Sequence, residues 1–271
     1  MGENGWHLVS TPAGRYAAAR SLEQFPFLAQ GVTLRGEPAD AYNLSFSVEA
    51  RREVVRRNRQ AACALFDFPV ESLVVPAQVH GAEVAVVGEE HQGAGALSPE
   101  TAIPSCDALV TATPGLLLGI TIADCLPICF FDPLHRAIGL AHSGWRGTAG
   151  RIALRTLEAM ARAFGTRAQA CLAAIGPGIG PDGYEVDERV HAAFDPHDAA
   201  APGVFTPTRP GHWTLDLTAA VCHQLRLAGV PEPNIARSPW RTHRDTDLFF
   251  SHRLVPGCPR MGAFLGLRQL T

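Results

Sequence analysis

The sequence predicts an α+β or layered sandwich fold, formed as one domain over residues 1–271. Two observations lead to this prediction. Apolar runs typical of strands follow one another at hairpin-like spacing, and isolated amphipathic segments typical of helices interrupt them. This order differs from the regular strand–helix alternation of a doubly wound parallel sheet. Because neither a fixed repeat nor a long linker divides the chain, all strands are expected to share one core.

Ten apolar runs are predicted to form strands, because each is a short apolar stretch of strand length. They cover residues 73–79, 83–87, 108–111, 116–122, 127–131, 137–141, 173–175, 213–215, 235–238 and 262–267. Two segments between them are predicted to be surface loops. One is the Gly-, Ala- and Pro-rich segment 89–105, and the other is segment 195–211, which contains four prolines.

Three amphipathic segments are predicted to be helices. The first covers about residues 48–65 and carries arginines along one side. The second starts with Thr148 as its cap and ends at Gly165, because a threonine hydroxyl accepts from free helical N–H groups and glycine favours the left-handed end of a helix. By the same argument, the third starts with Asp216 and ends at Gly229.

Composition excludes several classes of function. The formal net charge is -3 and the isoelectric point is about 6.4, so the chain has no basic surplus for binding nucleic-acid phosphates. All 23 basic residues are arginine, and the absence of lysine excludes Schiff-base chemistry on a lysine amine. Small molecules rather than nucleic acids are therefore the expected partners of a monomer or homodimer.

The expected setting of the protein is the cytoplasm. Residues 1–10 have neither the basic start nor the apolar stretch of a signal peptide, and no apolar run approaches the length of a membrane span. The seven cysteines are an odd number without a secretory context, so they are predicted to be reduced thiols.

Reactive side chains are concentrated in three segments that follow apolar runs. These segments are residues 78–81, 123–127 and 141–148. Because the preceding runs are expected to be buried, His80, Cys125 and His142 are expected to emerge at a sheet edge, where a rigid frame fixes their direction.

Two imidazoles and a thiolate form a ligand set that suits zinc, and three protein ligands leave one tetrahedral position open, as in catalytic zinc sites. A water bound at that position would be acidified to near neutrality. The intervals of 45 and 17 residues between His80, Cys125 and His142 match no compact zinc motif. On the residues alone, two hydrogen-bonded edge histidines and a buried thiol therefore remain an equal alternative.

A second interpretation uses the same atoms without a metal. In it, Cys125 and His142 form a thiolate–imidazolium nucleophile, and Asp124 orients the histidine. Because a metal-bound thiolate is a poor nucleophile, the metal content of the protein distinguishes the two interpretations.

The turn 143–148 leads into the second predicted helix. Free N–H groups at this helix start and the guanidinium of Arg146 are predicted to bind a phosphate co-substrate. The alternative is an ion pair between Arg146 and a carboxylate such as Asp124.

The glycine-proline loop 175–181 is predicted to shape the substrate pocket, with Tyr184 and Glu185 as polar contacts, or else to be a rigid connection. It is not a phosphate-binding loop, because no Gly-Lys-Ser/Thr follows and its prolines lack amide donors. Nearer the C-terminus, Arg253 and Arg260 are predicted either to close the pocket or to anchor a subunit contact.

Eight short blocks of sequence carry a resemblance to a known family. They are Asn43-Leu-Ser, Asn58-Arg59, Gln78-Val-His80-Gly, Asp107-Ala-Leu-Val-Thr, Ala123-Asp-Cys125-Leu-Pro-Ile, Ala141-His142-Ser-Gly-Trp-Arg146-Gly-Thr, Ile175-Gly-Pro-Gly-Ile-Gly and Phe249-Phe-Ser. In this order, over about residues 43–260, they resemble the laccase-domain or YfiH-like proteins. Each block alone is weak, and the set is highly specific.

The resemblance implies a layered α/β/β/α fold, shared with certain cysteine hydrolases, and a zinc ion held by His80, Cys125 and His142. The implied activity is phosphorolysis of adenosine, inosine and S-methyl-5′-thioadenosine, accompanied by deamination of adenosine. Purine nucleosides and phosphate are the implied ligands. The implied catalytic residues are Asp124, Cys125, His142 and Arg146. The implied substrate contacts are Gln78, Asn43, Arg59 and Tyr184.

Other functions remain open beside this one. Family members have also been described as polyphenol oxidases, for which copper would occupy the same site, although the 11 histidines form no His-x-His pair of the kind that a multicopper laccase needs. Some bacterial members are linked to peptidoglycan-precursor editing, which fits a cysteine hydrolase or amidase. A zinc-stabilised partner-binding protein without activity is a further alternative.

The sequence departs from the family around the predicted pocket. Phe46-Ser47-Val48-Glu49 stands where His-Val-Gly-Asp is usual, Arg241 where cysteine is usual, His252 where tyrosine is usual, and Pro259 where glycine is usual. These departures leave the preferred nucleoside open and do not touch the predicted metal ligands.

Overall fold

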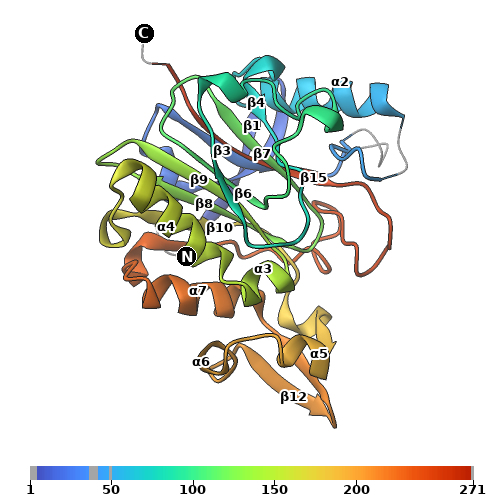
Figure 1. Ribbon diagram of the computed structural model, residues 1–271. Coiled ribbons are helices and arrows are strands. Elements are labelled where there is room, and N and C mark those ends of the chain that lie inside the picture. The colour runs from blue at the N-terminus through green and yellow to red at the C-terminus, as the bar shows by residue number, and fades with distance from the viewer. Residues whose placement is uncertain (1–4, 37–41, 49–50, 270–271) are drawn as a thin grey trace.

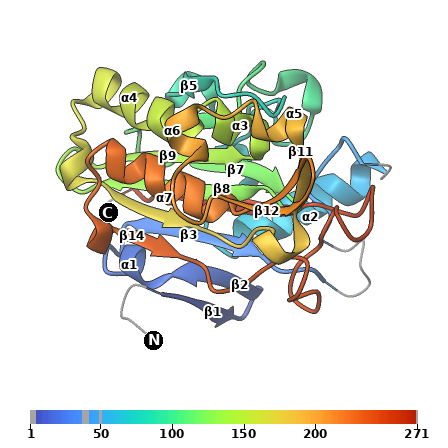
Figure 2. The ribbon, with the colours of Figure 1, turned by 90° about the horizontal axis from the view of Figure 1, so that it is seen from below.

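In the computed structural model, which describes residues 5–36, 42–48 and 51–269, two large sheets stack face to face and helices cover their outer faces (Figure 1 and Figure 2). The first sheet has six strands in the order β1-β2-β3-β15-β7-β4. Its strands are β1 (Trp6–Thr11), β2 (Gly14–Ala19), β3 (Leu28–Thr33), β15 (Met261–Leu267), β7 (Leu117–Ile122) and β4 (Leu73–Val74).

The second sheet also has six strands, in the order β14-β10-β8-β9-β6-β5. Its strands are β14 (Ile235–Arg237), β10 (Leu172–Ile175), β8 (Leu126–Asp132), β9 (Ala137–Ser143), β6 (Ala108–Thr111) and β5 (Val84–Val86). The central pairs are antiparallel, and the two edge pairs, β10 with β14 and β5 with β6, are parallel.

A third, small sheet projects from the body at the lower end of Figure 1. It pairs β11 (Glu185–Asp187), β13 (His212–Leu215) and β12 (Phe205–Arg209). The helices are α1 (Arg20–Glu23), α2 (Arg52–Ala64), α3 (Trp145–Ala149), α4 (Ile152–Phe164), α5 (Glu188–His191), α6 (Pro196–Ala199) and α7 (Leu217–Leu227). No helix in the described ranges is both long enough and apolar enough to cross a membrane.

Strand β8 shows how the layers are held together. Its side chains alternate between the two faces of the sheet. Ile128 and Phe130 pack with α4 and α7 in one apolar cluster, while Cys129 and Phe131 pack against the first sheet in another. A third cluster joins α2 to the outer face of the first sheet. Because β8 is buried on both faces, its sequence is a continuous apolar run, which made the strand predictable.

All ten predicted strands have counterparts, although the first is much shorter than predicted. Of residues 73–79, only Leu73–Val74 pairs as a strand. The chain then leaves the first sheet, and the N–H groups of residues 79–81 bond to Asp107 beside the second sheet.

Strands β1, β2, β3, β11 and β12 were not predicted. In β3, Gln30 and Gly31 interrupt the apolar pattern, yet every residue of the strand is buried. The Gln30 side chain is satisfied by the backbone N–H and carbonyl of Ala19, each at 3.1 Å. The predicted loop 195–211 was wrong in part, because it contains α6 and β12.

The predicted start of the second helix was wrong. Two helices, α3 and α4, take its place, and Arg151 with φ 59° rather than Thr148 is the N-terminal cap of α4. The Thr148 hydroxyl instead donates to the carbonyl of Gly144, at 2.9 Å within α3.

The other helix ends largely follow the predictions. Gly165 caps the C-terminus of α4 in the left-handed conformation, and the Asp216 carboxylate caps α7 by accepting from the N–H of Ala219 at 2.9 Å. The first predicted helix begins at Arg52 rather than at residue 48, and residues 49–50 of that prediction lie outside the described residues.

Candidate metal centre and substrate cavity

Strand pairing brings His80, Cys125 and His142 to one edge of the second sheet. The antiparallel register of β8 and β9 places Cys125, which directly precedes β8, beside the end of β9 that carries His142. Strand β6 pairs with the other side of β9, so Asp107, which directly precedes β6, also lies next to His142. The turn that carries His80 joins the same place, because β5 runs parallel to β6.

The three predicted ligands form a compact cluster. One ligand atom from each lies within 4.8 Å of the others, and the two imidazole rings meet at 80° with their centroids 4.8 Å apart. His142 is buried, Cys125 is half-buried and His80 is exposed. In the described part of the chain, this is the one group of three such side chains that could hold a metal ion. Two imidazoles and a thiolate match the donor set of a three-ligand zinc site.

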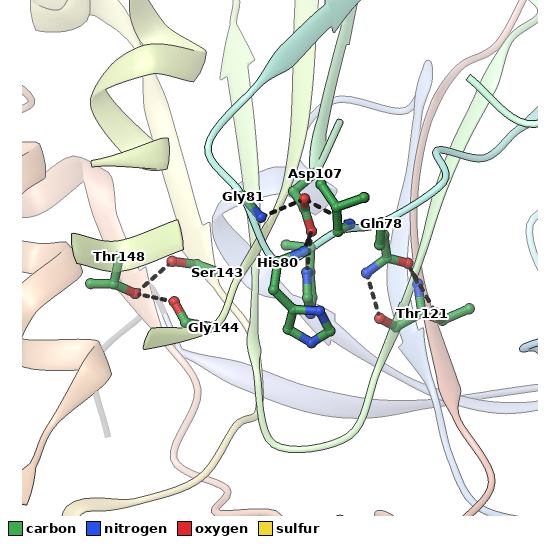
Figure 3. A network of polar contacts seen from close by, with 10 residues as sticks. Gln78, His80, Gly81, Asp107, Thr121, Ser143, Gly144 and Thr148 are labelled. Carbon is green, nitrogen blue, oxygen red and sulfur yellow. Dashed lines mark hydrogen bonds and ion pairs between the residues drawn. The ribbon is translucent and has the colours of Figure 1, made fainter. Parts of the chain in front are cut away.

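Asp107 lies next to this cluster and holds the turn that carries His80, as Figure 3 shows. Its carboxylate is fully buried and accepts four hydrogen bonds. They come from the N–H groups of Val79 (3.0 Å), His80 (3.0 Å) and Gly81 (2.8 Å), and from Nδ1 of His142 (2.8 Å). Because Nδ1 of His142 is bonded to a carboxylate, its Nε2 is left as the ligand atom, which is the usual arrangement behind a metal-binding histidine.

The same hydrogen bonds hold a strained backbone. His80 has φ 59° and Asp124 has φ 86°, both in the left-handed region that side chains other than glycine rarely adopt. Such a conformation costs on the order of 1–3 kcal/mol and persists where the surroundings enforce it, often at functional sites. At His80, the carboxylate of Asp107 supplies that enforcement by binding three consecutive N–H groups.

The cluster favours a charged sulfur. Burial opposes ionisation of the Cys125 thiol, but the charge and hydrogen bond of His142, aided by His80, lower its pKa to about 6. Burial also opposes the His142 imidazolium, and the Cys125 thiolate and the Asp107 hydrogen bond together raise the pKa of His142 to about 9. A thiolate is the form of cysteine that binds metals and acts as a nucleophile.

Gly144 lies directly against the sulfur. A Cβ atom at this position would stand 2.8 Å from Cys125 Sγ, closer than real Cβ contacts allow. We expect Gly144→Ala to weaken metal binding by about tenfold or more, because a displaced ligand loses its geometry. Competition with a chelator measures the affinity.

Gly81→Ala is the matched control for this variant, because its nearest contact would be an ordinary 3.4 Å to Val79 Cγ2. Equal metal affinities in the Gly144→Ala variant, the Gly81→Ala variant and the unchanged protein would contradict the prediction.

A cavity of about 870 Å³ opens over the cluster. Its lining includes the three ligands together with Gln78, Asp124, Arg146 and Tyr184, all of which were predicted site residues. Arg253 and Arg260 also line it, as does His252, one of the positions where the sequence departs from the family pattern. Glu49, another such position, lies outside the described residues.

Asn43 and Arg59, predicted as substrate contacts, are not among the residues that line the cavity. Both are buried, and Arg59 donates to the backbone carbonyls of Leu44 (2.8 Å), Gly95 and Ala96 (2.9 Å). Asn43 accepts from the N–H of Arg260 at 3.0 Å. These two side chains therefore hold loops behind the cavity wall.

Asp124 lines the cavity but does not orient His142, so that prediction was wrong. Its Oδ1 accepts from the Thr242 hydroxyl at 2.5 Å, and its Oδ2 accepts from the N–H of Arg253 at 2.7 Å. The carboxylate thus ties the C-terminal segment to the turn before β8 that carries Cys125, and the orienting carboxylate is Asp107.

The predicted ion pair of Arg146 with Asp124 is not formed. Arg146 is exposed, its guanidinium lies 4.7 Å from the ring centroid of Trp145, and it has no ion-pair partner in the described ranges. The helix that follows, α3, has only five residues. A helix dipole therefore adds little here, and the guanidinium itself is the anion-binding group that the turn offers.

Asp107 is the functional residue that sequence reasoning did not identify. Its one signal was its place directly before the buried run 108–111, where an unpaired carboxylate would be costly. Gln78 was identified, but its amide is largely occupied, since Nε2 donates to the carbonyl of Thr121 (3.0 Å) and Oε1 accepts from its N–H (2.8 Å).

The fold and the site define this chain as a protein of stacked sheets with a His₂Cys centre at the edge of a large cavity. It belongs to the family described as "Multi-copper polyphenol oxidoreductase laccase", which matches residues 28–268. The predicted YfiH-like resemblance and mixed α/β fold are confirmed, because the crystal structure of the hypothetical protein YfiH from Bacillus licheniformis has a TM-score of 0.85 at 29% identity, covering 91% of this chain and 95% of that one.

Relatives with named activities share most of the chain. The purine nucleoside phosphorylase YlmD from Geobacillus stearothermophilus is 39% identical over 234 residues, covering 86% of this chain and 85% of the relative. Its crystal structure has a TM-score of 0.85, with 35% identity over 99% of this chain and 98% of that one. The adenosine deaminase RL5, from an unknown prokaryotic organism, is 37% identical over 185 residues, covering 68% of this chain and 70% of the relative.

Proposed function

We propose that this chain is a zinc-dependent purine nucleoside phosphorylase that acts on adenosine, inosine and S-methyl-5′-thioadenosine and also deaminates adenosine. The observation that carries the proposal is the His80–Cys125–His142 cluster, which lines a cavity of about 870 Å³. Such a volume suits a nucleoside and a small co-substrate together. The names of the relatives support the class of reaction. A cytoplasmic setting and a monomeric or homodimeric state remain predictions.

Zinc fits the site better than the copper set of an oxidase. His80, Cys125 and His142 would hold the zinc ion, which would act as a Lewis acid on the substrate. A multicopper oxidase needs several histidine-rich centres, whereas the sequence has no His-x-His pair and a single candidate cluster lies within the described residues.

The residues around the cluster have distinct tasks in the proposed reaction. Asp107 fixes the direction of His142, and Arg146 presents guanidinium donors that suit phosphate. Tyr184 and Gln78 line the cavity where the nucleoside would lie.

Two cavity carboxylates that could move protons during deamination, Asp124 and Glu185, are both engaged. Both oxygens of Asp124 accept hydrogen bonds, and Glu185 is paired with Arg209 at 2.7 Å. The deaminase part of the proposal therefore rests on the relative named adenosine deaminase RL5 and on the Lewis acid, not on a free general base.

The direct test combines metal analysis with product analysis. Purified protein is analysed for zinc and copper, and then incubated with each of the three nucleosides, with and without inorganic phosphate. We expect about one zinc per chain and phosphate-dependent release of hypoxanthine from inosine. A zinc-loaded protein that releases no base from any of the three nucleosides would refute the phosphorylase proposal.

A cysteine hydrolase or amidase is the second candidate, because the metal-free geometry resembles a catalytic triad. The Cys125 sulfur is hydrogen-bonded to His142, and His142 is hydrogen-bonded to the Asp107 carboxylate. A nucleophile, a base and an orienting group are arranged in this way in a triad. Bound metal would occupy the sulfur and block this chemistry.

Alkylation tests this candidate. We expect iodoacetamide to modify Cys125 rapidly in chelator-treated protein and slowly in zinc-loaded protein. The other six cysteines are buried, and burial raises the pKa of each of them, so they serve as internal controls. Peptide mass mapping locates the label. Equal labelling of Cys125 with and without zinc would contradict its role as a ligand.

A further inference from the structure

The charged side chains on the cavity wall are unequally partnered. Each acidic side chain has a partner. Asp124 accepts from Thr242 and from the N–H of Arg253, Glu185 forms an ion pair with Arg209, and Asp187 accepts from the N–H of Val190 at 3.3 Å. The basic ones, Arg146, Arg253 and Arg260, have no ion-pair partner in the part of the chain that the structure describes. The wall therefore offers guanidinium groups without ion-pair partners to a ligand that enters the cavity, while its carboxylates already accept hydrogen bonds.

Arg253 is held more firmly than an ordinary surface arginine. Its backbone N–H donates to Asp124 Oδ2 at 2.7 Å, and its Nη2 donates to the carbonyl of Glu185 at 2.8 Å. Its guanidinium also lies 4.9 Å from the ring centroid of Tyr184. One of the five guanidinium donors is thus used to fix the group. The remaining donors are preorganised, so little side-chain entropy is lost when they bind a ligand.

Arg146, Arg253 and Tyr184 line the same cavity. The two arginines come from distant parts of the sequence, Arg146 from α3 and Arg253 from the C-terminal segment that Asp124 anchors. Burial raises the pKa of the Tyr184 hydroxyl and the charge of Cys125 raises it further, while the charges of Arg253 and Arg146 both act to lower it. The geometric link is the cavity itself, whose lining includes Tyr184, both arginines and Cys125, and the 4.9 Å contact of Arg253 with the Tyr184 ring.

We propose that Arg253 and Arg146 form a two-arginine site for a tetrahedral oxyanion, inorganic phosphate, on the Tyr184 side of the cavity. Two planar guanidinium forks that line the same cavity can together donate to several oxygens of a dianion. The identity of the anion as a co-substrate rests on the proposed phosphorylase function, whereas the existence of the site does not.

Arg260 is a weaker candidate for the same task. Its Nη1 donates to the carbonyl of Cys258, and its Nη2 lies 3.4 Å from Nδ1 of His252. These contacts turn its donors towards its own loop. Arg253, which makes one such contact, keeps more of its donors for a ligand.

Calorimetric titration of inorganic phosphate into the metal-loaded protein tests the site without any nucleoside. We expect Arg253→Gln to raise the phosphate dissociation constant about 10- to 100-fold, because a charged hydrogen-bond pair is lost. Arg253→Lys keeps the charge and loses the planar fork, so its phosphate dissociation constant should lie between those of the unchanged protein and Arg253→Gln. Arg162→Gln is the control for net charge, because Arg162 is exposed on α4 and does not line the cavity. This variant should bind phosphate as the unchanged protein does.

Kinetics supply a second measurement. In phosphorolysis, Arg253→Gln should raise the KM for phosphate by a similar factor and change the KM for the nucleoside much less. If Arg253→Gln does not fold, Arg253→Lys and Arg146→Gln carry the test, since each should weaken phosphate binding.

The outcomes separate the two proposals. Unchanged phosphate affinity in Arg253→Gln, or no phosphate binding by the unchanged protein, overturns the two-arginine site. Arg253-dependent phosphate binding in a protein that never performs phosphorolysis supports the site and refutes the proposed function.

Discussion

Replacement of Cys125 by alanine is expected to remove the metal from the protein and to lower nucleoside turnover by at least about a thousandfold. The sulfur is one of three side-chain ligands, and it brings the only negative charge among them because its pKa is lowered to about 6. Two neutral imidazoles hold a divalent ion much more weakly than a set that includes a thiolate. Elemental analysis of the variant and its rate of base release from inosine measure both effects.

Cys129→Ala is the matched control for Cys125→Ala. Cys129 lies four positions further along the same chain segment, in β8, and is buried in the apolar cluster between the two sheets. Its loss should cost stability on the order of 1 kcal/mol, as the removal of a small buried group does, and should leave metal content and turnover intact. A Cys125→Ala protein with a full complement of zinc would refute the assignment of the ligand.

The clustering of His80, Cys125 and His142 could be predicted from the sequence because the ends of strands can be recognised in it. Cys125 and His142 stand next to apolar runs that became β8 and β9, and the pairing of these strands brings the two residues together. The prediction required only that the runs be strands of one sheet. It did not require knowledge of the turn geometry that places His80.

The orienting carboxylate could not be predicted in the same way. Asp124 precedes Cys125 directly, and this adjacency suggested it as the orienting group. Asp107 stands far from both histidines in the sequence. In the structure, the register of β6 against β9 places Asp107 beside His142. The backbone of Asp124 is left-handed, and its carboxylate accepts hydrogen bonds from Thr242 and Arg253 instead. Sequence spacing contains no information about this register.

Strands that are buried on both faces could be predicted from the sequence, and other strands were harder to predict. Strands such as β8 are apolar throughout, whereas β3 contains the buried but satisfied Gln30, and β12 is largely exposed. The small sheet β11-β13-β12 contributes Glu185, Asp187 and His212 to the cavity. A wall of the site was therefore built from elements with the weakest sequence signal.

Asp107→Asn is expected to be the most informative change behind the metal ligands. The carboxylate accepts three backbone N–H groups and Nδ1 of His142, and an amide can accept on one atom only. The NH₂ group of the asparagine would face a hydrogen-bond donor, so the free energy of unfolding should fall by about 3 kcal/mol. Loss of the partner behind His142 should in addition weaken zinc binding about 10- to 100-fold.

Asp132→Asn separates these two effects, because Asp132 has partners of the same kind at the end of β8 that is remote from Cys125. It is fully buried and accepts from the N–H groups of Leu134 (2.9 Å) and His135 (3.3 Å) and from Nδ1 of His135 (2.8 Å). We expect both variants to melt at lower temperature and only Asp107→Asn to lose zinc affinity, measured by chelator competition well below the melting temperature. Asp132 satisfies donors of the same kind, but these lie away from the metal ligands. If the two variants bound zinc equally well, the role of Asp107 would therefore be limited to holding the turn at residues 79–81.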